Sequence, residues 1–589
     1  MNKQNLKLAL AQCNYTVGDF EGNRQLMQAK MKHAAEVGAD MVIFSELSVC
    51  GYYPGDLLED GDFLQACETA LHAILKASTQ FPNLFSVIGT VRLHQGPGKR
   101  LHNALLVIRD GEILTEYHKQ LLPTYGIFDE GRHFEPGVET ACTLTIGSHR
   151  VGFMVCEDGW NDAGLDYKVN PYAALEQAQV DLVVSINASP SDFGKRQQRH
   201  RLFGQASTAH QMPIVYVNQI GGQDQLVFDG HSFIMHPQRG LVYEAAGFAE
   251  DFAVLNFDGD NFFEAQDIGS KIGDQIGTAP RAAVTQKEEL ARQQIVLGLR
   301  DYARRCGFSK AVVGSSGGID SALTLALAVE ALGADNVIAI TMPSAFSSEG
   351  SVSDSVKLCQ ALGIPLLEHP IRDLVEQYGK GFTQAFDAPL RGLTLENLQA
   401  RVRGTILMEY SNHFGALLLT TGNKSEISVG YCTLYGDTNG GLGLIGDLYK
   451  TEVYALSRHI NQSAGREIIP HDVLTKPPSA ELAPGQLDTD SLPPYEVLDE
   501  ILKWHIEGHR LPPEEAQQAQ AFVENLKNTV DGAALLKRIH GMVARNEYKR
   551  RQAPPIIRVR ARAFGSGRQM PIAARYTFEA CLKPNKEVI

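Results

Sequence analysis

Three polar residues follow short apolar segments in the first half of the chain, and their chemistry suits attack on a carbonyl carbon. Cys156 directly follows Val151–Val155, and Glu46 and Lys119 also come just after apolar segments. A thiol exposed where a strand ends can act as a nucleophile. A carboxylate can take the thiol proton, and an ammonium lowers the thiol pKa and stabilises an oxyanion. Together these side chains could transfer an acyl group, although a lone cysteine is more often a buried structural thiol.

A second group of residues has the composition of a phosphate-binding loop. Gly314–Ser321 reads Gly-Ser-Ser-Gly-Gly-Ile-Asp-Ser and lies between a strand candidate, Ala311–Val313, and an apolar helix candidate, Ser321–Leu332. Small residues let backbone N–H groups approach a phosphate, and a helix N-terminus favours anions. The loop lacks the lysine of a Walker A motif. Asp320 is placed where a divalent cation could bridge to the phosphates.

Another strand candidate, Leu417–Thr420, is followed by Thr421-Gly422-Asn423-Lys424-Ser425-Glu426. In a parallel sheet this strand would end at the same edge as the glycine-rich loop and would bring a hydroxyl, a cation and a carboxylate to it. Such groups suit a nucleotide and Mg²⁺. A simple helix cap around Ser425 is the structural alternative.

These groups need a layered α/β framework to hold them, and the first 257 residues have the alternating pattern of one. The strand candidates are Leu6–Ala11, Met41–Phe44, Phe85–Gly89, Ala104–Ile108, Ile113–Tyr117, Val151–Val155, Leu182–Ile186 and Ile214–Val217. Residues 258–283 are polar and glycine-rich, as expected of a linker. We therefore predict one domain over residues 1–257, a linker over 258–283, and a second domain over 284–589.

The second domain begins with a predicted helix near Gln286. It continues with the strand, loop and helix around Gly314–Ser321 and with a further strand, Val337–Met342. This order is a βαβ unit of a doubly wound parallel sheet. After His471 the chain is proline-rich, then helical, and it ends with a basic segment from Arg545 to Arg568.

Composition limits the class of protein. The 589 residues are 44% hydrophobic and 21% charged, which is typical of a folded globular chain. The formal charge of −14 argues against general binding to nucleic acid or to anionic membranes. Nine cysteines without a C-x-x-C pair suggest neither a disulfide framework nor a zinc module. No segment has the ~20 apolar residues of a membrane helix. We expect a cytoplasmic protein.

The first group of residues resembles the nitrilase, or carbon–nitrogen hydrolase, superfamily. Glu46, Lys119 and Cys156 match its Glu-Lys-Cys triad in order and context, and the segment Tyr125–Arg132 matches the family's segment after the lysine, including a second glutamate at Glu130. The resemblance implies an α-β-β-α sandwich and amide hydrolysis through a thioester. It makes Cys156 the nucleophile, Glu46 the general base, Lys119 the electrostatic support and Glu130 a helper beside them.

Glutamine is the substrate that the resemblance suggests. The segment 187–195 would place Ser189 and Lys195 near one rim of the site, although both also occur as ordinary loop residues. In glutamine-using members of the superfamily, similar positions hold the head group of the free amino acid. By resemblance, Tyr125, Ser189 and Lys195 contact glutamine in this chain.

The second group resembles the ATP pyrophosphatases through Ser316–Ser321, and the two-domain order is similar to the NAD synthetases in their glutamine-dependent form. The resemblance implies Mg²⁺ ligands at Asp320 and Glu426, and deamido-NAD contacts at Asn397, Glu426 and Lys549. It assigns ATP to Gly314, Ser315, Ser316, Gly317, Gly318, Ile319, Asp320, Ser321, Met342 and Thr421.

Other segments match this family to different degrees. Pro477–Leu482 resembles a mobile loop that closes over the ligand, whereas Thr438 and the segment 443–446 depart from the family's commoner residues. For the basic C-terminal segment, two interpretations stay open: a solvated face, or an approach of Lys549 and its neighbours to the dinucleotide phosphates. An RNA-binding tail is disfavoured because few aromatic residues are interleaved.

The resemblance implies that glutamine supplies ammonia to an adenylated nicotinate carboxylate, which gives NAD, AMP, pyrophosphate and glutamate. A sheltered path for ammonia and a homo-oligomer are implied in the same way. Two alternatives remain at this point. One is another glutamine-dependent amidotransferase of the ATP-pyrophosphatase class, and the other is a nitrilase-type amidase with a regulatory nucleotide-binding domain.

Overall fold

The computed structural model describes residues 5–138, 140–264 and 286–574. The chain divides into two compact units, Met1–Val284 and Thr285–Ile589, and each is described by itself. Within the described residues, no helix combines the length and the apolar character needed to cross a membrane.

The first unit alternates strands and helices along most of its length. Its helices are α1 (Phe20–Glu36), α2 (Gly61–Ser78), α3 (Pro171–Gln177) and α4 (Lys195–His210). Its strands are β1 (Leu6–Gln12), β2 (Met41–Ile43), β3 (Phe85–Leu93), β4 (Leu101–Arg109), β5 (Glu112–His118), β6 (Cys142–Ile146), β7 (His149–Val155), β8 (Leu182–Ile186), β9 (Ile214–Val217), β10 (Ile220–Gln223), β11 (Leu226–Asp229), β12 (Phe233–His236), β13 (Gly240–Glu244), β14 (Asp251–Phe257) and β15 (Phe262–Glu264).

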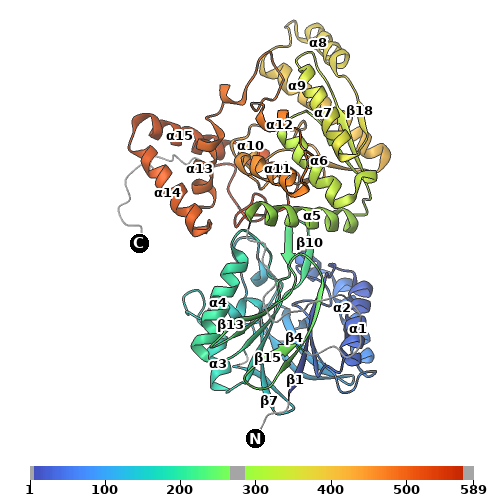
Figure 1. Cartoon of the computed structure of the whole chain (residues 1–589), viewed down its shortest axis with the longest axis vertical. Helices are drawn as coiled ribbons and strands as arrows, with labels where there is room; N and C mark the ends of the chain where they lie inside the picture. The colour runs from blue at the N-terminus through green and yellow to red at the C-terminus, as the bar shows by residue number, and fades with distance from the viewer. Residues whose placement is uncertain (1–4, 139, 265–285, 575–589) are drawn as a thin grey trace. The chain divides into compact units, whose positions relative to one another are not determined.

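Two sheets lie face to face in this unit, one ordered β15-β14-β1-β2-β3-β4-β5 and the other β13-β12-β9-β8-β7-β6. Alternation along β1 explains the layers. Leu8 packs with Phe153 in the core between the sheets, whereas Ala9 joins the core that includes Met27 of α1. The second sheet packs its other face against α3 and α4, and Figure 1 shows helices on both outer sides of the strands. The predicted α-β-β-α sandwich is confirmed.

The first part of the predicted linker needs a correction. Phe262–Glu264 form a strand that pairs antiparallel with β14, and the ring of Phe262 stacks on that of Phe257 at 4.7 Å. Two phenylalanines after a glycine-containing turn make a hairpin, because their rings can cover the strand that precedes them. The rest of the predicted linker, 265–283, lies outside the described residues.

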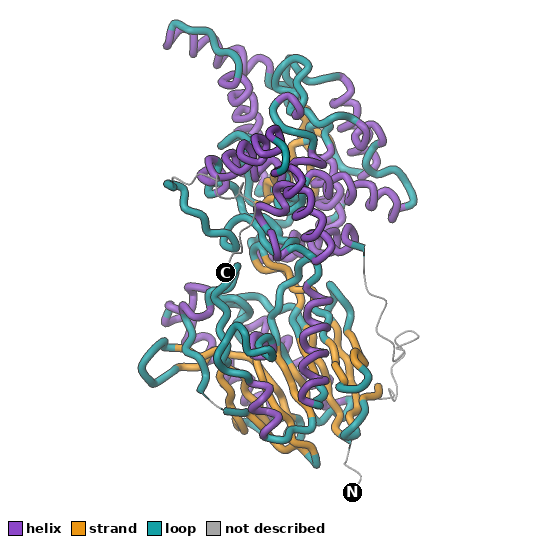
Figure 2. Tube along the Cα trace, turned by 90° about the vertical axis from the view of Figure 1, so that its left-hand side faces the viewer, coloured by secondary structure: helices purple, strands orange, loops and turns teal. Residues whose placement is uncertain are grey.

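The second unit is richer in helix, as Figure 2 shows by colour. Its strands are β16 (Ala311–Gly314), β17 (Val337–Thr341), β18 (Leu366–Glu368), β19 (Leu417–Thr420) and β20 (Leu442–Gly443). Its helices are α5 (Lys287–Arg305), α6 (Ile319–Leu332), α7 (Glu349–Leu362), α8 (Arg372–Phe386), α9 (Leu393–Phe414), α10 (Lys424–Val429), α11 (Lys450–Ala464), α12 (His471–Thr475), α13 (Tyr495–Ile506), α14 (Pro513–Lys527), α15 (Val530–Arg545) and α16 (Glu547–Arg550).

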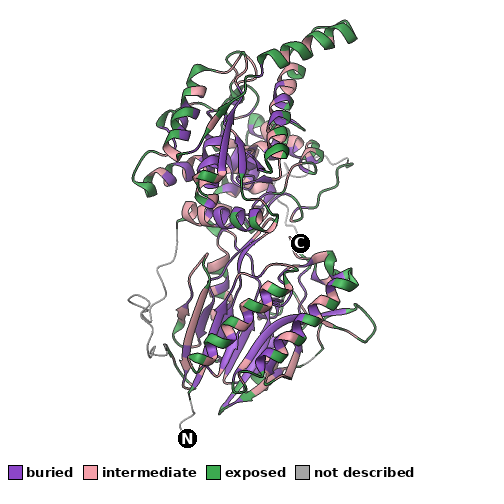
Figure 3. Ribbon diagram, turned by 90° about the vertical axis from the view of Figure 1, so that its right-hand side faces the viewer, coloured by how far each residue is buried: buried purple, intermediate pink, exposed green. Residues whose placement is uncertain are grey.

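Its sheet is ordered β18-β17-β16-β19-β20, and every adjacent pair is parallel. The order reverses between β16 and β19, so the loops after these two strands leave in opposite directions and open a crevice at their carboxyl ends. Strands β16, β17, β19 and β20 are almost entirely buried (Figure 3), in keeping with their apolar sequence, whereas the edge strand β18 is partly exposed. The doubly wound parallel sheet is therefore confirmed, and α13, α14 and α15 pack around a separate apolar core beside it.

Candidate functional site

The three residues predicted to act on an amide all lie just beyond strand ends of the first unit. Glu46 follows β2, Lys119 directly follows β5, and Cys156 directly follows β7. All three are buried, Glu46 completely. Cys156 has a φ of 45°, which is the left-handed region. This turn lets the chain reverse immediately after the strand and places the thiol at the sheet edge.

A compact hydrogen-bond network ties the carboxylates to the lysine. Lys119 Nζ donates to Glu46 Oε1 at 2.7 Å and to Glu130 Oε1 at 2.8 Å. Asn103 Nδ2 donates to Glu46 Oε1 at 2.7 Å, and the backbone N–H of Ala188 donates to Glu46 Oε2 at 3.0 Å. Glu130 thus contacts the lysine directly, as closely as Glu46 does. Sequence reasoning missed Asn103, which carries no local signal of this contact.

Burial sets the protonation of this centre. The pKa of the Cys156 thiol is well above its ordinary value, because the group is buried and faces the charge of Glu46, with Lys119 opposing the shift. Burial disfavours the charge of Lys119, but Glu130 and Glu46 outweigh it and raise the lysine pKa. The thiol is therefore neutral in the resting centre beside a permanent ammonium, so attack on a carbonyl requires a base to remove its proton.

The residues predicted to hold glutamine are placed differently from one another. Ser189 is buried, and its Oγ accepts a hydrogen bond from Nε of Arg199, which is itself paired with Asp229 at 2.9 Å. Lys195 is the first residue of α4, and its Nζ lies 3.8 Å from the ring centroid of Trp160. Ser189 is thus held in place by Arg199 of a buried ion pair. The ammonium of Lys195, in contrast, is held against the face of an aromatic ring.

Glu157 is a further candidate that sequence reasoning did not single out. It follows Cys156, is buried, and accepts hydrogen bonds from the hydroxyls of Tyr125 and Tyr167 at 3.1 and 3.0 Å. Burial raises its pKa, and the charge of Lys119 is the largest opposing influence. An acidic residue directly after a candidate nucleophile was the available signal. A carboxylate here and the ammonium of Lys195 are complementary to the two charges of a free amino acid.

In the second unit, the glycine-rich loop joins β16 to α6 and is shaped by its smallest residues. Gly317 has a φ of 74°, and a Cβ at this position would lie 2.3 Å from the backbone oxygen of Ser351. No other residue type fits such a close approach. Ser321 Oγ accepts from the N–H of Ser316 and donates to the carbonyl of Gly318. These contacts fix the loop in front of the helix N-terminus.

A cavity of about 580 Å³ lies at this edge of the sheet. Gly317 and Ser321 do not line this cavity. They determine the conformation of the glycine-rich loop through the contacts described above. The predicted residues that line it are Gly314, Ser315, Ser316, Gly318, Ile319, Asp320, Met342, Asn397, Thr421, Glu426 and Lys549. Residues at the ends of β16, β17 and β19 and on α6, α9, α10 and α16 thus converge on one space, as expected at the carboxyl edge of this sheet.

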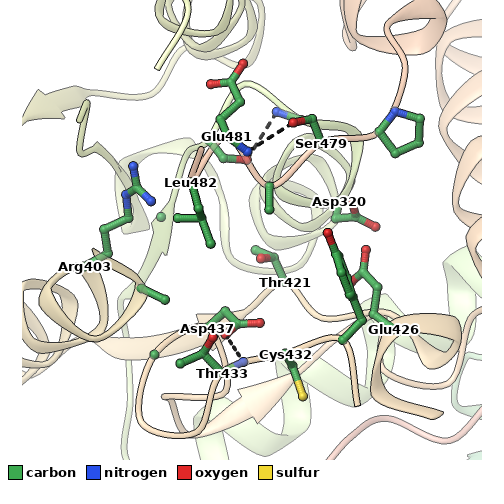
Figure 4. A pocket seen from close by; sticks show the side chains of 18 of the residues that line it. Asp320, Arg403, Thr421, Glu426, Cys432, Thr433, Asp437, Ser479, Glu481 and Leu482 are labelled. Carbon is green, nitrogen blue, oxygen red and sulfur yellow. Dashed lines mark hydrogen bonds between the residues drawn. The ribbon is translucent and has the colours of Figure 1, made fainter. Parts of the chain in front are cut away.

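Two carboxylates meet in this cavity, and Figure 4 shows Asp320 and Glu426 next to each other on one side of it. Lys450 Nζ lies 2.5 Å from Asp320 Oδ2 and 3.0 Å from Glu426 Oε1. Asn423 Nδ2 donates to Asp320 Oδ1 at 2.8 Å, and Asn423 also caps α10. Burial raises the pKa of Glu426 to about 8, with Lys450 lowering it and Asp320 raising it. The helix-cap interpretation is thus correct as well, although the cap is Asn423 rather than Ser425.

Two protein families match the chain, one within each unit. A profile of the family described as Carbon-nitrogen hydrolase matches residues 7–259, and one described as NAD synthase matches residues 291–553. The glutamine-dependent NAD(+) synthetase of Synechocystis sp. is 42% identical to this chain, over 97% of this chain and 99% of its own length. The chain belongs to the glutamine-dependent NAD(+) synthetase family.

Solved structures of the family cover the same length. The glutamine-dependent NAD+ synthetase from Acinetobacter baumannii, in complex with adenosine diphosphate, is 35% identical with a TM-score of 0.73, and the match covers 97% of this chain and 98% of that one. A glutamine-dependent NAD(+) synthetase from Cytophaga hutchinsonii shares the fold at 20% identity with a TM-score of 0.78, over 98% of this chain and 99% of that one.

In this member of the family, the residues predicted to contact deamido-NAD line the cavity. Two of them also form hydrogen bonds with the neighbouring segment 430–433. Lys549 Nζ donates to the carbonyls of Gly430 and Cys432, each at 2.8 Å. Asn397 Oδ1 accepts from the hydroxyl of Thr433 at 2.8 Å. Both side chains therefore support the segment 430–433 in addition to facing the cavity. A merely solvated Lys549 is excluded by these contacts.

The segment predicted to close over the ligand, 477–482, lines the cavity opposite the segment 430–433. Figure 4 shows Glu481 and Leu482 across the cavity from Thr433. The Glu481 carboxylate accepts from the hydroxyl of Ser351 at 2.7 Å, and Gln399 Nε2 donates to the carbonyl of Leu482 at 2.9 Å. Hydrogen bonds from the Ser348 hydroxyl to the Glu481 carboxylate at 2.9 Å and from the Asp488 N–H to the Pro478 carbonyl at 3.1 Å also hold this loop in place.

The basic C-terminal segment needs a correction, because neither open interpretation describes its centre. Arg560 is fully buried and pairs with Glu507 at 2.7 Å, with Glu515 at 2.7 Å, and with Glu452. Lys424, also fully buried, contacts Glu507 at 3.2 Å. The segment is thus clamped into the synthetase unit beside α10 and α11. Sequence patterns could not show this, because the acidic partners lie 45 to 108 residues earlier in the chain.

Proposed function

We propose that this chain makes NAD from deamido-NAD, ATP and glutamine, with AMP, pyrophosphate and glutamate as the other products. The observation that carries the proposal is the presence of both centres in one chain that matches glutamine-dependent NAD(+) synthetases over nearly their full length. We assign glutamine hydrolysis to residues 1–257 and the ligase reaction to residues 284–589. The protein is thus a ligase that forms a carbon–nitrogen bond.

In the first domain, the Cys156 sulfur attacks the amide carbon of glutamine while Glu46 takes the thiol proton. The oxyanion that forms is stabilised by the ammonium of Lys119, which its two carboxylates keep charged and fixed. Glu46 then gives the proton to the leaving nitrogen, and ammonia departs. Water, deprotonated by Glu46, attacks the thioester, and glutamate leaves as the thiol is restored.

In the second domain, a carboxylate must be activated because its own oxygen is a poor leaving group. An oxygen of the nicotinate carboxylate attacks the α-phosphorus of ATP, and the bond to the β-phosphate breaks. Ammonia attacks the acyl carbon, loses a proton, and releases AMP. The loop of Gly314–Ser321 offers backbone N–H groups and a helix N-terminus to the phosphates. The ADP complex of the Acinetobacter baumannii relative supports an adenine nucleotide as a ligand of this chain.

We propose Asp320 and Glu426 as ligands of Mg²⁺. Their oxygens are hard donors, and they converge closely enough for one cation, the Lys450 ammonium, to contact both. When bound, the ion would neutralise charge on the phosphates during adenylation. We keep Tyr125, Ser189 and Lys195 as the residues around glutamine and add Glu157. Asn397, Glu426 and Lys549 remain our proposal for deamido-NAD.

We also propose that the protein is cytoplasmic and forms a homo-oligomer. The family resemblance motivates both statements. The exposed apolar side chains of α8 offer a face for contact with a second copy: Leu374, Tyr378 and Phe386 are 41%, 61% and 68% exposed. Apolar side chains gathered on one helix face are unusual on a monomer.

A single assay tests the proposed function. The purified chain is incubated with deamido-NAD, ATP, Mg²⁺ and glutamine, and NAD, AMP and glutamate are measured by mass spectrometry. We expect the three products in equal amounts. Glutamine hydrolysis without NAD would favour an amidase with a regulatory domain, and ATP cleavage that requires an acceptor other than deamido-NAD would favour another amidotransferase. Either result would overturn the proposal.

Replacement of Glu157 with glutamine tests the assignment of the amino-acid site. The change keeps an acceptor for Tyr125 and Tyr167 but removes the charge that would face the substrate ammonium. Hydrogen bonds to charged groups contribute about 1.5–3 kcal/mol, so we expect the KM for glutamine to rise about 10- to 150-fold. Glutamate release is the measurement. Glu112→Gln, an exposed change on β5, is the matched control. An unchanged KM would contradict the assignment.

A further inference from the structure

Lys450 occupies an unusual place for a lysine of a ligand cavity. Its side chain is 3% exposed, and its Nζ contacts both carboxylates that we propose as magnesium ligands, at 2.5 and 3.0 Å. It also lies 5.2 Å from the ring centroid of Tyr495. The ammonium therefore stands where the oxygens of Asp320 and Glu426 converge.

The two carboxylates are held by hydrogen bonds from their surroundings, whereas the lysine side chain lies along the cavity lining. Asn423 Nδ2 fixes one oxygen of Asp320 at 2.8 Å, and Glu426 belongs to the capping box of α10. The backbone of Lys450 is anchored, since its N–H donates to Ser425 Oγ at 2.9 Å. Its four-carbon side chain lines the cavity, so the ammonium can swing into that space while the carboxylates stay in place.

A divalent cation bound between these two carboxylates would compete with the ammonium for their negative charge. Mg²⁺ binds carboxylate oxygens at about 2.0–2.1 Å and requires a nearly octahedral shell. The ammonium lies 2.5 and 3.0 Å from one oxygen of each carboxylate, so an ion bound between those two oxygens would lie close to it and be repelled by its charge. We therefore expect a metal ion bound between the two carboxylates to displace the ammonium of Lys450. The displaced ammonium needs a new anionic partner, and the phosphates of a nucleotide held by the loop after β16 would provide one.

We propose that Lys450 is an internal placeholder cation that keeps divalent metal out of the Asp320–Glu426 site until a nucleotide enters the cavity. The proposal rests on the proposed function for these two ligands. Without a nucleotide, the lysine neutralises part of the charge of the carboxylate pair and competes with free metal. When the nucleotide enters, the lysine moves to the phosphates and the metal takes its place, so metal and nucleotide bind together.

The test measures Mn²⁺ binding to the full chain by electron paramagnetic resonance, with and without ATP. We expect the wild-type chain to bind Mn²⁺ weakly alone and more tightly with ATP. The Lys450→Met chain should bind one Mn²⁺ without nucleotide at least about tenfold more tightly than the wild type, because the competing charge is gone. Lys357→Met, which removes an exposed lysine that also contacts a carboxylate, should not change Mn²⁺ binding. Circular dichroism verifies the fold of each variant.

Three outcomes would overturn the inference. The first is a Lys450→Met chain that binds Mn²⁺ no more tightly than the wild type, while the wild type still binds it with ATP. The second is a Lys450→Met, Asp320→Asn double variant that keeps the tighter binding, since the metal would then lie elsewhere. If Asp320→Asn alone leaves ATP-dependent Mn²⁺ binding unchanged, the assignment of the metal ligands fails instead, and with it the inference.

Discussion

Replacing Cys156 with alanine is expected to abolish NAD synthesis from glutamine and to leave synthesis from ammonium intact. The alanine side chain cannot form a thioester, and removal of a catalytic nucleophile typically lowers turnover by about 10⁴-fold or more. The ligase residues belong to the other unit of the chain, so ammonia supplied from solution can still reach an adenylated carboxylate. NAD formation is measured with each nitrogen source at saturating ATP and deamido-NAD.

The control for this variant is a second buried thiol of the same unit. Cys142 lies on β6 and is buried in the core between the sheets. Cys142→Ala removes a sulfur from that core without touching Glu46 or Lys119, and we expect it to keep activity with glutamine. A folded Cys156→Ala chain that still uses glutamine would exclude the thioester route. A folded chain that loses both activities would argue against separable centres.

In the candidate glutaminase centre, the residues that could be predicted are those that directly follow a recognisable strand. Apolar runs identified β2, β5 and β7, and the residues just beyond them had to meet at one edge of the layered domain. Cys156 and its two partners were found in that way. Glu157 and Asn103 were not. Glu157 had a local signal, its place directly after Cys156, whereas the contact between Asn103 and Glu46 spans 57 residues and leaves no mark on the sequence around either one.

In the second unit, too, local motifs could be predicted from the sequence, whereas ion pairs between distant residues could not. The glycine-rich loop was predictable because backbone approach to a phosphate demands small residues at fixed spacing. Lys450 was not, because its partner Asp320 is 130 residues away. For Arg560 the sequence pattern was misleading, because it suggested an exposed side chain where the structure has a buried one. A run of arginines resembles an exposed surface, yet three carboxylates, on α11, just after α13 and on α14, pair with this one and offset the cost of burying its charge. Only the folded arrangement shows which charges are paired.

Replacing Asp320 with asparagine is expected to produce the reverse separation of activities. Asparagine keeps the size of the side chain but removes the charge that contacts Lys450 and that we propose to contact the metal. Loss of one group that stabilises developing charge lowers turnover by about 10²- to 10³-fold. NAD synthesis should therefore fall by this factor with glutamine and with ammonium alike, whereas glutamate release from glutamine continues.

The matched control is Asp335→Asn, because Asp335 is exposed in the short turn before β17 and lies outside the cavity lining. NAD, AMP and glutamate are measured for both variants at saturating ATP. If Asp320→Asn retained most of its ligase activity, neither the metal nor Lys450 could depend on this carboxylate. If it lost glutaminase activity as well, the hydrolysis of glutamine would have to depend on the state of the ligase centre. The expected result, in contrast to that of Cys156→Ala, assigns each half of the reaction to one unit of the chain.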